Sequence, residues 1–266
     1  MHVHDCFAWS PFIHAAVRNF ARARRRLELP DSSPGCLVLV EPSGGRRFVS
    51  LWNDPGAVCV AGWRVERGAD GRSLLFDCGG GATLLIVAGR QIVTAENLEV
   101  LAVACSREIR DSLPIRAALG AVADCGARAV VPWGFGKWLG RRGRIVRELI
   151  DALPVPFSLG DNGGRAGSLP RPPLFRLAER RGVPVLTGSD PLPLPREERR
   201  AGSYGFVLHE WRMTSRPAES LAERIGSLRG SPPSFGELNT VPGLIRAQLG
   251  LRWRRCTATP RTRAAA

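Results

Sequence analysis

The chain has 266 residues, of which 44% are hydrophobic and 23% are charged, so it is long and apolar enough to bury a full core. No apolar run reaches the ~18 residues that a membrane-spanning helix needs, and we expect a soluble, cytoplasmic protein with no membrane partner. The seven cysteines are widely spaced without a CxxC pair, which argues against a zinc knuckle or a disulfide scaffold.

The formal net charge of +14 raises the question of whether the protein binds nucleic acid. Lys137 is the only lysine, so the basic residues are almost all arginine, and they are spread along the chain. No aromatic residues alternate with the basic runs as a stacking platform requires. We therefore do not expect nucleic acid as a partner, and a basic nucleic-acid-associated protein is the weakest of three hypotheses.

The first third of the chain predicts a helix and several short strands. Residues 1–6 have the character of the end of a first strand, and apolar residues recur at helical spacing over 12–27. Turn signals then separate four expected strands, at 36–40, 48–52, 57–65 and 73–77. We interpret residues 30–82 as an antiparallel, β-rich insertion.

From residue 83 onward, expected strands and helices alternate. The expected strands are 83–88, 98–103, 128–132, 155–159, 183–187 and 205–208, and the expected helices are 113–125, 142–152, 173–181, 218–228 and 241–249. This pattern is typical of a parallel sheet with crossover helices. We predict an α/β fold, a TIM-like β/α barrel that is distorted or incomplete, as one domain over 1–251. The basic segment 252–266 is expected to be a disordered tail.

Polar residues gather in the turns that follow the later strands, where α/β folds place their chemistry. These turns contain Lys137, Asp161, Arg165 and Asp190. Lys137 and Arg165 could hold a negatively charged group, and the glycines before Arg165 would let backbone amides approach it. Trp133 could form a wall of the same pocket.

His2 and His4 are two residues apart and would face the same side of a strand, so both imidazoles could bind one metal ion. Asp190, in the segment Thr187-Gly188-Ser189-Asp190, is a candidate third ligand at the end of a late strand. Zinc, manganese and iron are the divalent metals that we consider.

These motifs resemble the PHP (polymerase and histidinol phosphatase) superfamily, and the late Gly-Ser-Asp is also similar to the amidohydrolases. The resemblance covers residues 1–20 and roughly 83–208, and it implies a metal-dependent barrel hydrolase. Two positions depart from the family pattern. Gln91 stands where a glutamate ligand is expected, and Trp133 stands where a histidine is expected. Gln91 could contact substrate instead.

Our leading hypothesis is therefore a metal-dependent hydrolase that acts on a phosphate ester or, less favoured, an amide of a small anionic molecule. His2, His4 and Asp190 would bind the metal, and Asp161 could add a further carboxylate. Lys137 and Arg165 would hold the substrate's negative charge. The alternative is a catalytically inactive barrel that binds a small anionic molecule without metal.

Overall fold

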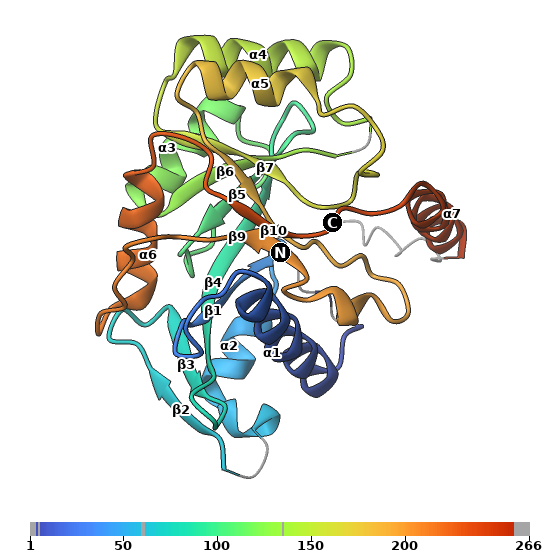
Figure 1. Cartoon of the computed structure of the whole chain (residues 1–266). Helices are drawn as coiled ribbons and strands as arrows, with labels where there is room; N and C mark the ends of the chain where they lie inside the picture. The colour runs from blue at the N-terminus through green and yellow to red at the C-terminus, as the bar shows by residue number, and fades with distance from the viewer. Residues whose placement is uncertain (1–3, 5, 60–61, 135, 258–266) are drawn as a thin grey trace, which may run out of the picture.

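The computed structural model describes residues 4, 6–59, 62–134 and 136–257, and it shows a mixed α/β fold built on one large sheet (Figure 1). The α-helices are α1 (Trp9–Arg26), α2 (Arg47–Asn53), α3 (Ile115–Asp124), α4 (Arg141–Ala152), α5 (Pro173–Arg180), α6 (Pro217–Gly226) and α7 (Val241–Thr257). Two short 3₁₀ helices, η1 (Pro55–Val58) and η2 (Glu197–Arg200), complete the helical elements of the described chain.

The large sheet has eight strands: β1 (Gly35–Glu41), β2 (Arg64–Arg67), β3 (Ser73–Asp77), β4 (Thr83–Val93), β5 (Glu99–Val103), β6 (Arg128–Pro132), β7 (Phe157–Asp161) and β8 (Val185–Thr187). They follow the order β2-β3-β4-β5-β6-β7-β8, and β1 pairs with β4 beside this path. A separate antiparallel pair is formed by β9 (Tyr204–Phe206) and β10 (Ser234–Gly236).

Strand β4 joins the two halves of the sheet because it pairs with three strands. It pairs in parallel with β1 over 84–90, and antiparallel with β3 over 83–87 and with β5 over 89–93. Since a strand has only two edges, β3 and β5 follow one another along the edge opposite β1. From β6 to β8 the pairing is parallel.

One face of the sheet carries helices along its whole length. Cross-strand partners share a face, and the partners Leu39 and Ala88 lie under α1 and α2. Arg90, two residues further along β4, pairs with Ala102 of β5. Ala102 in turn pairs with Ala129 of β6, and both alanines lie under α3, α4 and α5. The two main hydrophobic clusters are therefore neighbours on one face. Figure 1 shows α1 and α2 over one end and α4 and α5 over the other.

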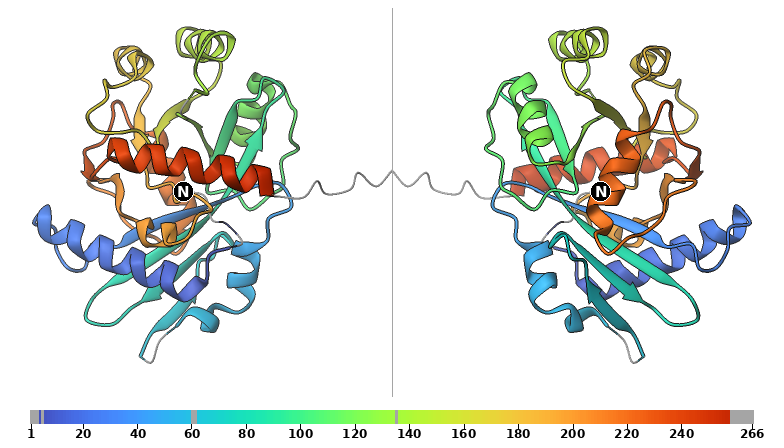
Figure 2. Two further views of the ribbon diagram at one scale, coloured as in Figure 1. Left: turned by 90° about the vertical axis from the view of Figure 1, so that its right-hand side faces the viewer. Right: turned by 90° about the vertical axis from the view of Figure 1, so that its left-hand side faces the viewer.

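The opposite face is covered by α6 and by the segment that contains β9 and β10. Ala218, Leu221 and Ile225 of α6 pack on Val87 and Val103 of the sheet. This third cluster is smaller than the other two, and it covers only part of the face. Helix α7 lies to the right of the sheet in Figure 1, and it crosses in front of the molecule in the left view of Figure 2.

The expected TIM-like barrel is wrong. The sheet of the described chain is open, and four of its seven strand pairings are antiparallel, whereas a β/α barrel closes eight parallel strands. The decisive connection is the short link 94–98 between β4 and β5. A parallel crossover needs about a dozen residues or more, so these two strands can only pair antiparallel.

The segment 30–82 is not a separate insertion. Its strands β1 and β3 both pair with β4, so the segment contributes to the main sheet. The strand expected at 48–52 is instead the helix α2, because Phe48 and Leu51 are the buried residues and their spacing of three matches a helix. Glu41 Oε1 accepts a hydrogen bond of 3.1 Å from the amide of Phe48 at the start of this helix.

Most other elements agree with the expected ranges, and β6 and β3 agree to the residue. The first strand expected at 1–6 lies largely outside the described residues. Helix α7 continues to Thr257, into the segment expected to be a disordered tail. Among the described residues, no helix combines the length and apolar character required to cross a membrane.

Candidate functional site

The face of the sheet that bears α6 encloses a cavity of about 440 Å³. Its floor consists of aliphatic side chains from four strands, namely Val38, Leu101, Val130 and Leu186. Helix α6 and the segment 204–211 line the other side, and polar residues from the carboxyl ends of β7 and β8 line one end. The cavity thus combines an apolar body with a polar end, as small-molecule sites usually do.

Asp161, the last residue of β7, is the central polar residue of that end and is only 2% exposed. Arg165 donates hydrogen bonds to its Oδ2 from Nε at 3.0 Å and forms an ion pair through Nη2 at 2.9 Å. The hydroxyl of Tyr204 contacts the same oxygen at 3.4 Å. One oxygen of the carboxylate is therefore held firmly by the protein.

The other oxygen, Asp161 Oδ1, is buried and has no hydrogen-bond partner among the described residues. The same is true of Thr187 Oγ1 on the neighbouring strand. Asp161 and Thr187 are partners in the register of β7 and β8, and both line the cavity. An unsatisfied buried polar group costs about 1–3 kcal/mol, so these two atoms form a site ready to accept a hydrogen-bonding ligand group.

The turn that follows β7 explains why Arg165 returns to Asp161. Gly163 has a φ of +68°, and a Cβ at this position would lie 2.9 Å from the ring of Tyr204. Asn162 Oδ1 accepts a hydrogen bond of 3.1 Å from the amide of Gly164, which closes an Asx turn. The glycines thus allow the turn to pack on Tyr204 and direct the arginine back to the strand end.

The loop after β8 lies beside this turn. Asn162 Nδ2 donates a hydrogen bond of 3.2 Å to Asp190 Oδ2. Ser189 is buried, and its Oγ accepts a hydrogen bond of 3.0 Å from the amide of Gly202. His4 Nε2 lies 3.1 Å from the carbonyl oxygen of Pro191. The structure therefore places His4 beside the loop that contains Asp190, while His2 lies outside the described residues.

Two side chains of the cavity have raised pKa values. Burial, aided by the negative charge of Asp161, raises the pKa of Tyr204 to about 12. Burial likewise raises the pKa of the Cys36 thiol on β1 to about 12. Both groups are therefore neutral at pH 7, and the Tyr204 hydroxyl remains a hydrogen-bond donor.

The second cation expected at the site, Lys137, does not line the cavity. Its ammonium forms an ion pair with Glu99 at the start of β5, and its side chain covers Gly134, where a Cβ would lie 2.6 Å from it. Trp133 packs against the core beneath α3 to α5. Gln91 is partly buried and in register with Leu101, but it does not line the cavity either.

The described residues do not fit a metal centre. They contain no group of three or more His, Cys, Asp and Glu side chains arranged to hold a metal ion. Asp161 is neutralised by Arg165, and His4 Nε2 is directed at a carbonyl oxygen that can accept its hydrogen. The ligand set expected from the sequence depends on His2, which is outside the described chain.

Two residues of the cavity were not predicted from the sequence. Arg24, on α1, is 7% exposed and lines the cavity, but it lies within an arginine-rich run that reads as a solvated helix face. Tyr204 is the only tyrosine of the chain. Its uniqueness was visible, although its proximity to Asp161 depends on how the loop after β8 returns to the sheet.

Comparisons with known proteins give information about the fold and none about function. No family model matches the chain, and no curated protein matches it. The fold is similar to that of PsfC from Pseudomonas syringae PB-5123, with a TM-score of 0.51 and 14% sequence identity. The similarity covers 91% of this chain and 90% of PsfC.

Proposed function

We propose that this protein binds a small molecule in the cavity, with an apolar body on the sheet and a hydrogen-bond donor against Asp161 and Thr187. The observation that carries this proposal is Asp161 Oδ1, a buried carboxylate oxygen without a partner among the described residues, at the polar end of an apolar cavity. A ligand amine or hydroxyl would satisfy this oxygen and would replace a costly unpaired acceptor by a charge-assisted hydrogen bond.

The ligand group recognised at the polar end is a hydrogen-bond donor, whereas the inactive barrel expected from the sequence would recognise an anion. Lys137 is paired with Glu99, and Arg165 is paired with Asp161, so the two cations expected to hold an anion already have acidic partners. What the polar end presents to the cavity is an acceptor, and its natural complement is a donor.

The test uses octylamine, which joins one ammonium group to an apolar chain, in isothermal titration calorimetry. The wild-type protein is expected to bind it at one site. Val130→Phe fills the floor of the cavity and should weaken binding at least about tenfold. Thr187→Val keeps the shape but removes the hydroxyl, and should weaken it about twofold to tenfold.

The matched control is Val131→Phe, because Val131 is the next residue of β6 and packs in the core on the opposite face. The folded fraction of this variant should bind octylamine with the wild-type affinity. The proposal fails if the wild type shows no saturable binding, or if Val130→Phe binds octylamine as tightly as Val131→Phe does.

A second candidate is metal-dependent hydrolysis of an ester or amide, which the contact between His4 and Pro191 supports. This contact brings an N-terminal histidine to the loop that contains Asp190. Within the described residues, His4 and Asp190 are the two candidate metal ligands in this region, and a catalytic zinc site uses three protein ligands. We therefore derive no step through a metal.

Metal analysis of the tag-free protein tests this candidate directly. Near-stoichiometric zinc, manganese or iron that is lost in both His4→Ala and Asp190→Ala would support it. Glu210→Ala is the control, because Glu210 lines the same cavity but is exposed. Absence of metal from the wild type, with all three variants folded, would exclude it.

A further inference from the structure

Arg24 is a buried cation whose environment differs from that of the other buried arginines. It is 7% exposed, and its Nη1 donates one hydrogen bond of 3.0 Å to the carbonyl oxygen of Ser33. Its Nε is buried without a hydrogen-bond partner among the described residues. Within that part of the chain it forms no ion pair, whereas buried Arg90 pairs with Glu41 and buried Arg165 pairs with Asp161.

A guanidinium in this position is energetically unfavourable unless something neutralises it. Arginine is almost never fully buried without a partner, because burial removes the hydration of the charge. A carbonyl oxygen satisfies one of its five donors and none of its net charge. The chemical complement of this charge is an anion, and Arg24 lines the cavity, from which an anionic group could reach it.

Arg24 and Asp161 lie toward opposite ends of the strands. Arg24 contacts Ser33, just before β1 begins at Gly35, whereas Asp161 ends β7. Strand β1 is parallel to β4, and two antiparallel pairings then make β6 and β7 run in the same direction. The cation is thus near the amino end of these strands, and the carboxylate is at the carboxyl end.

We infer that the ligand of the cavity is bipolar: an anionic group pairs with Arg24, a donor group pairs with Asp161, and an apolar body joins them. This inference rests on the proposed function, and it adds the second recognition group. The lining of the cavity supports it, because Val38, Leu101 and Val103 offer apolar surface on the sheet. A carboxylate or phosphate would suit the guanidinium, which can donate two parallel hydrogen bonds.

The experiment compares ω-amino alkanoates, from octanoate to dodecanoate, with the alkylamines of the same length. Both probes carry the ammonium for Asp161, but only the amino acids carry a carboxylate. The wild type should bind the best-fitting ω-amino alkanoate more tightly than its alkylamine. Arg24→Met should reduce affinity for that amino acid about tenfold to a hundredfold while changing alkylamine affinity less than about threefold.

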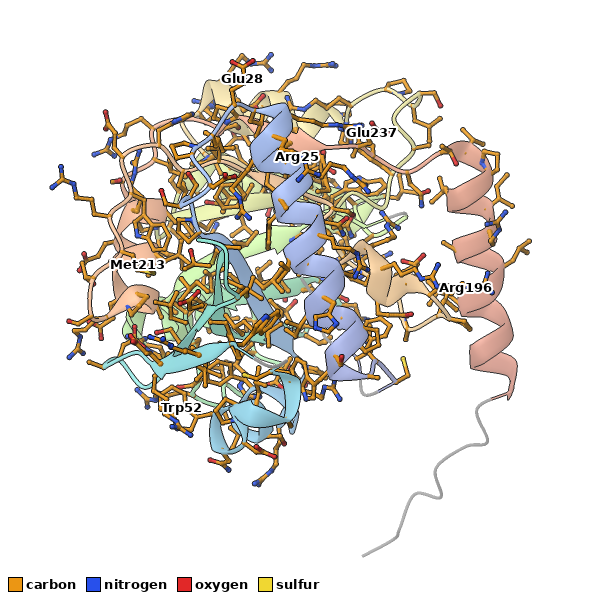
Figure 3. All side chains as sticks on the ribbon, turned by 60° about the horizontal axis from the view of Figure 1, so that its bottom comes forward. Arg25, Glu28, Trp52, Arg196, Met213 and Glu237 are labelled. Atoms are coloured by element: carbon orange, nitrogen blue, oxygen red, sulfur yellow. The ribbon has the colours of Figure 1, made fainter. Side chains whose placement is uncertain are left out.

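Arg25→Met is the matched control. Arg25 is the next residue of α1 and is exposed, and Figure 3 labels it at the end of this helix near Glu28. This variant should bind both probes as the wild type does. If alkylamines bind and are blocked by Val130→Phe, but Arg24→Met leaves the amino acids unaffected, the proposed function stands and the bipolar ligand is wrong. If Val130→Phe blocks nothing, the proposed function itself has failed.

A second measurement needs no ligand. If Arg24 serves ligand binding, the ligand-free protein carries an unneutralised buried charge, and Arg24→Met should leave the melting temperature level or raise it. Methionine replaces the aliphatic stem without the charge. A fall of about 4 °C or more relative to Arg25→Met would show that Arg24 stabilises the fold, and would overturn the inference.

Discussion

Arg165 binds Asp161 through a single carboxylate oxygen: Nε and Nη2 lie 3.0 and 2.9 Å from Oδ2, while Oδ1 has no partner among the described residues. Arginine can engage both oxygens of a carboxylate side by side, and here it does not. The ion pair therefore fixes the carboxylate through Oδ2 and leaves Oδ1 available to accept a hydrogen bond.

Asp161→Asn should destabilise the protein strongly, because it leaves the guanidinium of Arg165 buried without a counter-charge. We expect a loss of about 3–5 kcal/mol in the free energy of unfolding, measured by urea denaturation. Glu197→Gln is the control, since its ion pair with Arg200 is longer, at 3.4 Å, and partly exposed. That change should cost less than about 1 kcal/mol. Equal losses in the two variants would contradict this account.

Val130→Phe and Val131→Phe should differ in stability although they are adjacent. Val130 faces the cavity, where a phenyl ring finds space, so its free energy of unfolding should change by less than about 1 kcal/mol. Val131 is fully buried in the core beneath the helices, and overpacking there should cost about 1–3 kcal/mol. The measurement is the urea midpoint of each variant. A larger loss of stability in Val130→Phe than in Val131→Phe would contradict the assignment of Val130 to the cavity face and of Val131 to the core.

Tyr204 should ionise later than an ordinary tyrosine. Because it is the only tyrosine, the ultraviolet absorbance of tyrosinate reports this residue alone. Burial and Asp161 raise its pKa to about 12, so the folded protein should show little tyrosinate at pH 10, whereas the urea-unfolded chain should be about half ionised there. A raised folded pKa stabilises the fold below about pH 10, and this contribution is lost as the pH rises through about 12. Coincident titration curves would contradict the burial of the hydroxyl.

The ion pair between Arg171 and Glu179 should make stability depend on acid pH. Two hydrogen bonds of 2.6 Å from Arg171 lower the pKa of Glu179, and Ser231 contributes a third. A lowered folded pKa gives stability above the unfolded pKa that is lost as the pH falls through the folded value. Glu179→Gln should therefore be less stable than the wild type at pH 7, and the difference should shrink in acid. Exposed Glu148→Gln should show no such change.

The sequence predicted local elements better than their assembly. The periodicity of residues 128–132 and 73–77 gave the right strands, because a buried strand is recorded in its own side chains. The direction of β4 relative to β5 depends on the length of the link 94–98, and the parallel pairing of β1 with β4 depends on residues more than forty positions apart. The resemblance to barrel hydrolases supplied a closed topology that these connections do not permit.

The candidate site was predicted in part for the same reason. Asp161, Arg165 and Asp190 follow strands that run in parallel, so their proximity could be expected, and the structure places them together. Lys137 follows such a strand too, but its partner is Glu99, which the antiparallel β5 brings beside it. Arg24 could not be selected, because its burial depends on where α1 meets the sheet.

The three partners of β4 bear on how the chain could be divided. A cut near residue 81, in the turn before β4, would separate β1, β2 and β3 from the strand that two of them need. The first fragment would keep α1 and α2, and the second would keep α3, α4 and α5, so neither would hold all the helices of that face. The two pieces would be expected to fold by complementing one another, with β4 as the recognition element, rather than as independent units.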